Sequence, residues 1–247
     1  MRLTKQRKMI ISGSLTALSV ILAVLSHSSC CYLAALAMGI STLGDALLAG
    51  YPECIENKLA KGGLAFLAAH ILYICTLLAS YGKSIPELLT HSALPFSLFL
   101  VLTVLHGLLF YSRGSSRFSP GLFAAASFYL LTVGIHAAAA VTVYGQAGGG
   151  YLLSAAGAIL FFLSDAVLLA RKYGAVRGKY VTAVIWLTYV PAQLCLIRCE
   201  DHRCFPVRTA IRMVPSSQMD FRRLRNRRIS CIFNPKEIQK RMRRRLS

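Results

Sequence analysis

The stretch Ser41–Tyr73, STLGDALLAGYPECIENKLAKGGLAFLAAHILY, places ionisable side chains inside two apolar segments. Asp45 lies in the first segment and His70 in the second, and only a short polar turn, Tyr51–Lys58, separates them. Two long apolar segments joined by such a turn are typical of a hairpin of transmembrane helices. A charged side chain in such a helix costs at least about 2.5–3.5 kcal/mol on insertion scales, so both residues are candidates for a functional site.

The composition of the whole chain also indicates a membrane protein. Hydrophobic residues make up 55% of its 247 residues and charged residues only 15%, whereas a soluble domain carries roughly 25% charged residues. A helix needs about 20 apolar residues to cross a bilayer. Seven segments approach that length: Met9–Ser26, Cys30–Gly50, Leu59–Ser80, Ala93–Tyr111, Pro120–Tyr144, Tyr151–Ala170 and Tyr180–Ile197. We therefore predict an all-α fold, a polytopic membrane helix bundle of about seven transmembrane helices within residues 1–197.

The net charge of +19 does not indicate nucleic-acid binding, because of where the basic residues lie. Of 28 Lys and Arg residues, 15 follow residue 197, twelve lie before the first segment or in alternate loops, and only Lys83 lies in a loop of the other face. This bias places the N-terminus in the cytoplasm. Residues 198–247 contain no apolar run of spanning length, so we predict a basic, disordered tail that contacts anionic membrane lipid. Seven spans would put this tail outside, opposite to what its charge predicts.

A second aspartate, Asp165, lies in the later apolar run GAILFFLSDAVLLA. At 1.5 Å per residue, Asp45 and Asp165 lie about 7–8 Å inside the cytoplasmic ends of their helices, with His70 at about 16 Å and Tyr189 at about 14 Å. The shared depth of the carboxylates predicts that the two aspartates and His70 meet in a cavity open to the cytoplasmic leaflet. The spacing of Phe66, His70 and Tyr73 puts them on one helix face, which is either a packed aromatic seam or a pocket wall.

Three motifs resemble the signatures of the lysoplasmalogenase (YhhN-like) family. LGDALL with FLAAHILY is similar to the first signature, GAILFFLSD to the second and TYVPAQLCLI to the third, in the same order and with similar spacing. The resemblance covers roughly Lys8–Ile197. The family has eight helices, and a lysine of a Lys-Pro pair opens its second. Lys8 lies at about the corresponding distance from Asp45, so we expect the chain either to lack the family's first helix or to begin downstream of it.

The resemblance implies a membrane-embedded hydrolase that cleaves the alkenyl ether bond of lysoplasmalogens to a fatty aldehyde and a glycerophospho-alcohol. The catalytic residues would be Asp45, Asp165 and His70. The motifs contribute four substrate-binding candidates, namely Tyr73, Ser164, Tyr189 and Gln193. The substrate would be a lysophospholipid taken from membrane lipid, and we expect a multi-pass protein of the bacterial inner (cytoplasmic) membrane. The eight cysteines form no CxxC pair and no HExxH motif is present, so we expect neither a metal nor a cofactor.

Two other classes of protein fit the same residues. Sets of intramembrane Asp and His also mark proton relays, so a small transporter or proton-coupled carrier is the main alternative. The sequence shows no inverted repeat or paired broken helices that would favour it. A structural membrane protein with buried polar contacts explains single residues but not their shared depth.

Overall fold

The computed structural model describes residues 5–53, 56–82, 85–90, 92–114 and 119–198. The chain divides into two units, Met1–Cys204 and Phe205–Ser247, and every described residue lies in the first. The described residues form only helices: α1 (Lys5–Ser26), α2 (Ser29–Ala49), α3 (Lys58–Tyr81), α4 (Ile85–Thr90), α5 (Ala93–Gly114), α6 (Pro120–Ala147), the 3₁₀ turn η1 (Gly149–Tyr151), α7 (Leu152–Lys172) and α8 (Val181–Leu196). The predicted basic tail, residues 198–247, lies almost entirely outside the described residues and stays a prediction.

The prediction of an all-α membrane helix bundle is confirmed. Five helices of the described chain are long and apolar enough to cross a membrane, namely α1, α2, α3, α6 and η1 together with α7. The apolar helix α8 has 16 residues, and α5 is apolar over Ala93–Leu109. Each of the seven predicted segments therefore coincides with one long helix, and the short α4 is an addition.

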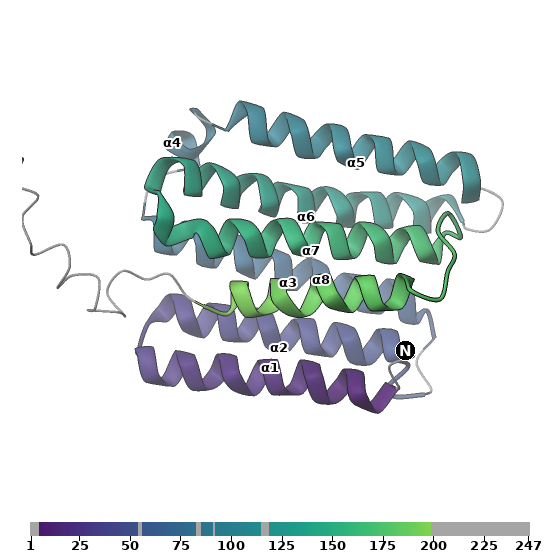
Figure 1. Ribbon diagram of the computed structural model, residues 1–247, viewed down its shortest axis with the longest axis horizontal. Coiled ribbons are helices and arrows are strands. Elements are labelled where there is room, and N and C mark those ends of the chain that lie inside the picture. The colour runs from purple at the N-terminus through teal and green to yellow at the C-terminus, as the bar shows by residue number, and fades with distance from the viewer. Residues whose placement is uncertain (1–4, 54–55, 83–84, 91, 115–118, 199–247) are drawn as a thin grey trace, which may run out of the picture. The chain divides into compact units, whose positions relative to one another are not determined.

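The long helices of this unit run side by side (Figure 1). Helix α2 packs between α1 and α3, α6 contacts α3, α5 and α7, and α8 packs on α7. Alanines fill much of the centre, with Ala137–Ala140 of α6 all buried. Small residues allow helix backbones to approach closely where lipid provides no hydrophobic driving force between helices.

Glycines set two of these helix contacts. A Cβ at Gly44 of α2 would lie 2.8 Å from the ring of Phe66 in α3, so the ring occupies the space that a side chain would need. In α7, a Cβ at Gly157 would lie 2.8 Å from Cys195 Cβ and 3.0 Å from the carbonyl oxygen of Ala192 in α8. The first contact brings the helix of Asp45 against α3, and the second brings the helix of Asp165 against α8.

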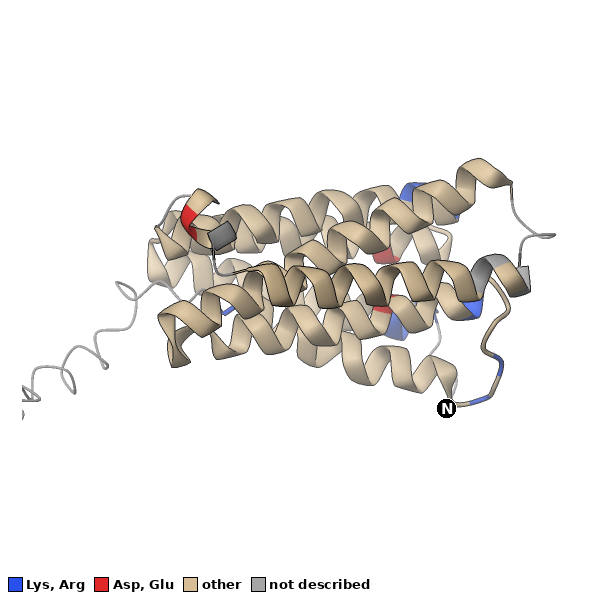
Figure 2. Cartoon of the chain, turned by 90° about the horizontal axis from the view of Figure 1, so that it is seen from above, with Lys and Arg blue, Asp and Glu red and all other residues tan. Residues whose placement is uncertain are grey.

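The basic side chains of the described helices gather at one end of the bundle. Figure 2 shows most Lys and Arg positions at the end where the chain begins, while acidic positions lie nearer the middle and, at Glu87, in the short α4 at the opposite end. The basic loop after α7 begins at Arg171 and Lys172, which are the last two residues of that helix. This distribution matches the loops from which the cytoplasmic end was predicted.

Candidate active site

A cavity of about 330 Å³ opens among α2, α7 and α8 near the basic end of the bundle. Both aspartates line it, Asp45 from α2 and Asp165 from α7. Ser164 and Tyr189 line the same cavity. Four of the seven residues predicted for the site are thus brought together around one space, although they come from three helices that are far apart in the sequence.

Asp45 is held by hydrogen bonds from two other helices. Its Oδ2 accepts the hydroxyl hydrogen of Tyr189 in α8 across 2.8 Å. The same oxygen accepts a hydrogen bond from Ser12 in α1, a residue that is completely buried. Together these two hydrogen bonds fix the direction of the carboxyl group. Asp45 is half-buried and faces the cavity from this fixed position.

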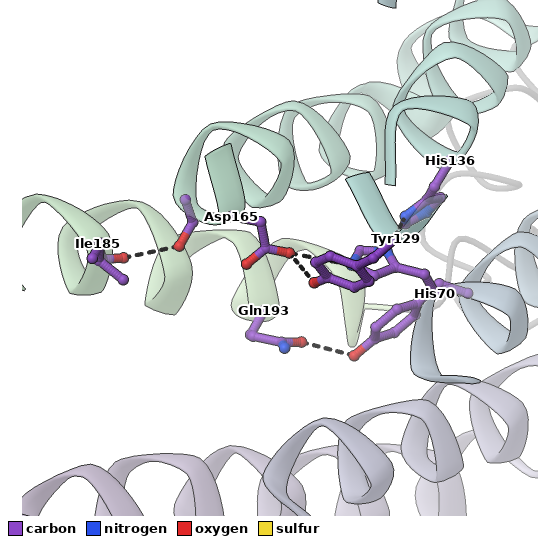
Figure 3. Close-up of polar contacts among 8 residues, drawn as sticks. His70, Tyr129, His136, Asp165, Ile185 and Gln193 are labelled. Carbon is purple, nitrogen blue, oxygen red and sulfur yellow. Dashed lines mark hydrogen bonds and ion pairs between the residues drawn. The ribbon is translucent and has the colours of Figure 1, made fainter. Parts of the chain in front are cut away.

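Asp165 lies deeper in protein and is only 3% exposed. Its Oδ2 accepts a hydrogen bond from the hydroxyl of Tyr129 in α6, and Nε2 of His70 in α3 lies 3.8 Å from the same oxygen (Figure 3). Nε2 of His70 has no hydrogen-bond partner among the described residues. The carboxyl group therefore stands between the cavity on one side and a buried tyrosine and histidine on the other.

His70 is completely buried and continues the polar contacts away from the cavity. Its Nδ1 lies 3.1 Å from Nδ1 of His136 in α6. Two neutral imidazoles can form this contact only if one Nδ1 carries a hydrogen and the other offers its lone pair. The two rings therefore hold complementary tautomers, and the state of His136 determines whether Nε2 of His70 presents a hydrogen or a lone pair to Asp165.

Tyr73 and Gln193 form a buried pair and do not line the cavity. The hydroxyl of Tyr73 donates to Oε1 of Gln193 across 2.7 Å, and both side chains are at most 3% exposed (Figure 3). The hydroxyl of Ser164 donates to the carbonyl oxygen of Ile185 in α8, so its hydrogen is used in helix packing. Direct contact of Tyr73 or Gln193 with a substrate stays a prediction, and in this structure they join α3 to α8.

Three basic side chains complete the cavity at its outer part. Lys8 of α1 and Arg171 and Lys172 of α7 all line it. Nζ of Lys8 lies 5.8 Å from the ring centre of Trp186, another lining residue, which is within the range of a cation–π contact. The cavity thus combines two carboxyl groups in its inner part with three cations from the basic end of the bundle.

Several of these residues were not predicted from the sequence. Ser12 follows Lys8 by one helical turn. This i, i+4 spacing puts both residues on one face of an apolar helix and would have indicated that they face the same site. Tyr129 and His136 are seven residues apart in α6, which also puts them on one face. Ser12, Tyr129 and His136 belong to none of the three motifs. Their spacing was the available signal.

The fold and the cavity define a class, a multi-pass helical membrane protein with two intramembrane carboxyl groups beneath a cluster of cations. The family model described as the YhhN family matches residues 7–199, and the chain belongs to this family. Comparisons with curated proteins and with solved structures gave no match. The resemblance drawn from the three motifs is therefore confirmed at the level of the family.

Proposed function

We propose that this protein hydrolyses the alkenyl ether bond of lysoplasmalogens and releases a fatty aldehyde and a glycerophospho-alcohol. Hydrolase activity is associated with the YhhN family. The observation that carries the proposal is the pair Asp45 and Asp165, which come from separate motifs and line one cavity inside a helical membrane bundle.

The reaction needs a proton donor and a negatively charged group near one another. A proton adds to the β-carbon of R–CH=CH–O–R′, and the electron pair of the double bond forms the new C–H bond. The resulting oxocarbenium ion takes up water at the α-carbon, and that water loses a proton. The hemiacetal hydroxyl then loses a proton, the glycerol oxygen takes one up, and the bond between the α-carbon and that oxygen breaks, giving R–CH₂–CHO and HO–R′. A positioned general acid typically contributes about 10²–10⁴-fold to such a rate.

The contacts of the two aspartates suggest their roles. Asp45 accepts hydrogen bonds from Ser12 and Tyr189, which suits an ionised carboxylate that stabilises the oxocarbenium ion and takes a proton from water. Asp165 is more deeply buried and accepts one side-chain hydrogen bond, from Tyr129, whereas Asp45 accepts two. In this scheme Asp165 is the acid. His70 acts through Asp165 and is a positioning residue.

The cations support a phosphorylated substrate. Lys8, Arg171 and Lys172 line the cavity on which the carboxyl groups converge, and all three can donate hydrogen bonds to phosphate oxygens. A lysoplasmalogen carries its phosphate on the glycerol to which the alkenyl ether is attached. Binding the phosphate at the basic end of the bundle would leave the ether bond near the aspartates, within the membrane.

A proton-coupled carrier remains the second candidate, and one observation favours it. Asp165, His70 and His136 form a line of ionisable groups from α7 to α6 that leads away from the cavity. Such lines can pass protons through a membrane. A carrier would use this line without changing its substrate, whereas the hydrolase needs only the end that faces the cavity.

A substrate comparison tests the proposed reaction. Purified protein in lipid nanodiscs would be incubated with an alkenyl lysophospholipid and with its alkyl and acyl analogues, and aldehyde release would be measured. Only the alkenyl compound should give aldehyde, because only its double bond can be protonated to an oxocarbenium ion. No aldehyde from folded protein, together with proton flux in sealed vesicles, would favour the carrier instead.

A further inference from the structure

A second cavity, of about 280 Å³, lies among the first turns of α3 and α6 and the last turns of α2 and α7. Its lining is apolar except for one phenolic hydroxyl, that of Tyr129. The lining residues from α3 include Leu59, Gly63 and Leu64, and those from α6 include Leu122 and Phe128. No step of the proposed reaction uses this apolar space.

The apolar cavity borders the cavity that holds the aspartates. Leu48, Phe66 and Leu168 line both, so these three side chains form the wall between the two spaces. Tyr129 lines the apolar cavity, and its hydroxyl donates to Asp165, which lines the polar one. A molecule that occupied both spaces would therefore pass close to the carboxyl group of Asp165.

The apolar cavity also reaches the surface that faces lipid. Leu64 is 66% exposed and Phe128 is 61% exposed, and both line the cavity. In a bilayer such side chains lie among hydrocarbon chains, so a chain could move sideways from the membrane between α3 and α6. The same two helices are joined deeper in the bundle by the contact of His70 with His136.

We propose that this apolar cavity binds the hydrocarbon chain of the lysophospholipid substrate. The phosphate then lies at Lys8, Arg171 and Lys172. The bond to be broken lies at the wall formed by Leu48, Phe66 and Leu168. The inference rests on the proposed function. A lysophospholipid has one phosphorylated headgroup and one hydrocarbon chain. The two adjoining cavities match these two parts, because one contains three cations and two carboxyl groups and the other is apolar. Phe66 and Leu168 would then determine how the chain bends toward Asp165.

Gly63 provides a direct test, because it lines the cavity and a Cβ added to it would meet nothing within 4 Å. A Gly63→Phe side chain would fill space that the substrate chain needs without disturbing the helix contacts. Gly13 is the matched control, since a Cβ added there also meets nothing within 4 Å and Gly13 lines neither cavity. The probes are long-chain and short-chain alkyl ether lysophospholipids, which lack the double bond and cannot be hydrolysed.

Gly63→Phe should weaken binding of the long-chain probe at least about tenfold, which corresponds to losing the burial of roughly two methylenes. Binding of the short-chain probe should change little, and Gly13→Phe should bind both probes normally. Ala125→Leu, at the exposed edge of the cavity, should act in the same direction as Gly63→Phe, with the neighbouring exposed Ala124→Leu as its control. This second pair keeps the test decisive if Gly63→Phe does not fold.

Binding and hydrolysis separate the two proposals. If the unmodified protein binds the long-chain probe in the expected pattern but releases no aldehyde from the alkenyl substrate, the chain site stands and the proposed reaction is wrong. If aldehyde is released but all variants bind both probes like the unmodified protein, the apolar cavity holds a chain of ordinary bilayer lipid, and the chain-site proposal is overturned.

Discussion

Tyr189 of α8 donates a hydrogen bond of 2.8 Å to Oδ2 of Asp45 in α2, a contact between residues 144 positions apart. The same oxygen accepts a hydrogen bond from Ser12 of α1. The direction of the Asp45 carboxylate is therefore set by two helices other than its own. Any reaction that depends on this carboxylate should depend on the packing of α1 and α8 around it.

Tyr189→Phe should lower kcat for aldehyde release about ten- to a hundredfold with a smaller change in KM. The substitution keeps the ring and removes only the hydroxyl, and a hydrogen bond to a charged group contributes about 1.5–3 kcal/mol. Steady-state kinetics with the alkenyl substrate would measure the effect. Tyr144→Phe, at a partly exposed tyrosine near the end of α6, is the control and should be silent. Normal activity in Tyr189→Phe would contradict the assigned role of Asp45.

Asp45→Asn and Asp165→Asn should each lower turnover by at least about 10²-fold in protein that stays folded. Asparagine keeps the shape of the side chain but removes both the charge and the transferable proton. The double variant should be little worse than either single one, because residues that act as a unit fail together. Glu53→Gln, in the exposed turn before α3, makes the same chemical change outside the cavity and should have no effect. Near-normal aldehyde release from both single variants would favour the carrier.

His136→Phe should show whether the activity requires proton transfer through His136. The change leaves Nδ1 of His70 buried without its partner, which should reduce the free energy of unfolding by about 1–3 kcal/mol. Because His136 reaches the cavity only through His70, aldehyde release should fall less than tenfold. Thermal unfolding in detergent and the aldehyde assay would measure the two effects. A loss as large as that of the aspartate variants would indicate that protons pass through His136.

Gly157→Ala should destabilise the bundle by about 1–3 kcal/mol through overpacking. The added methyl group would lie 3.0 Å from a backbone carbonyl oxygen of α8, which cannot move aside as a flexible side chain can. Gly107→Ala in α5 is the control, because its Cβ meets nothing within 4 Å. That change should be neutral or stabilise the helix by up to about 1 kcal/mol. Unfolding midpoints measured side by side would show whether the two glycines differ in this way.

The predicted orientation can be tested with fused reporters. A reporter inserted at Gly174–Gly178, between α7 and α8, should lie in the cytoplasm, because basic residues concentrate on that side. A reporter inserted at Gly148, between α6 and α7, should lie outside. The reverse result would invert the bundle and place the cavity of the aspartates at the opposite leaflet.

Hydropathy predicted the helices of this protein well because the requirement for apolar length is local in the sequence. The first predicted segment, Met9–Ser26, differs from α1 only by four more residues at its basic start. Basic residues can extend a helix into the region of lipid headgroups, where they are solvated. The order of packing could not be predicted, because each long helix can in principle lie beside several others.

Residues of the candidate site were predicted from two signals, the cost of a charge inside the membrane and, for Ser164 and Tyr189, the family motifs. Asp45 and Asp165 stood out for the first reason, and both line the cavity. Tyr129 did not stand out, because a tyrosine in an apolar helix is common and its hydrogen bond to Asp165 depends on the rotation of α6 against α7. Tyr73 shares a helix face with His70, yet it contacts Gln193 behind the cavity, and only the tilt and neighbours of α3 decide this.

The ring of Phe66 occupies the space left by the missing side chain of Gly44, and the same ring separates the two cavities. The same ring therefore forms both the packing contact between α2 and α3 and the wall beside the aspartates. A substitution that enlarged or shifted this wall would also weaken the packing of α2, the helix of Asp45, against α3. Substitutions of Phe66 should consequently change the preferred chain length of the substrate and the stability of the fold together. Natural or engineered changes in chain-length preference should therefore occur more readily at Leu168 than at Phe66.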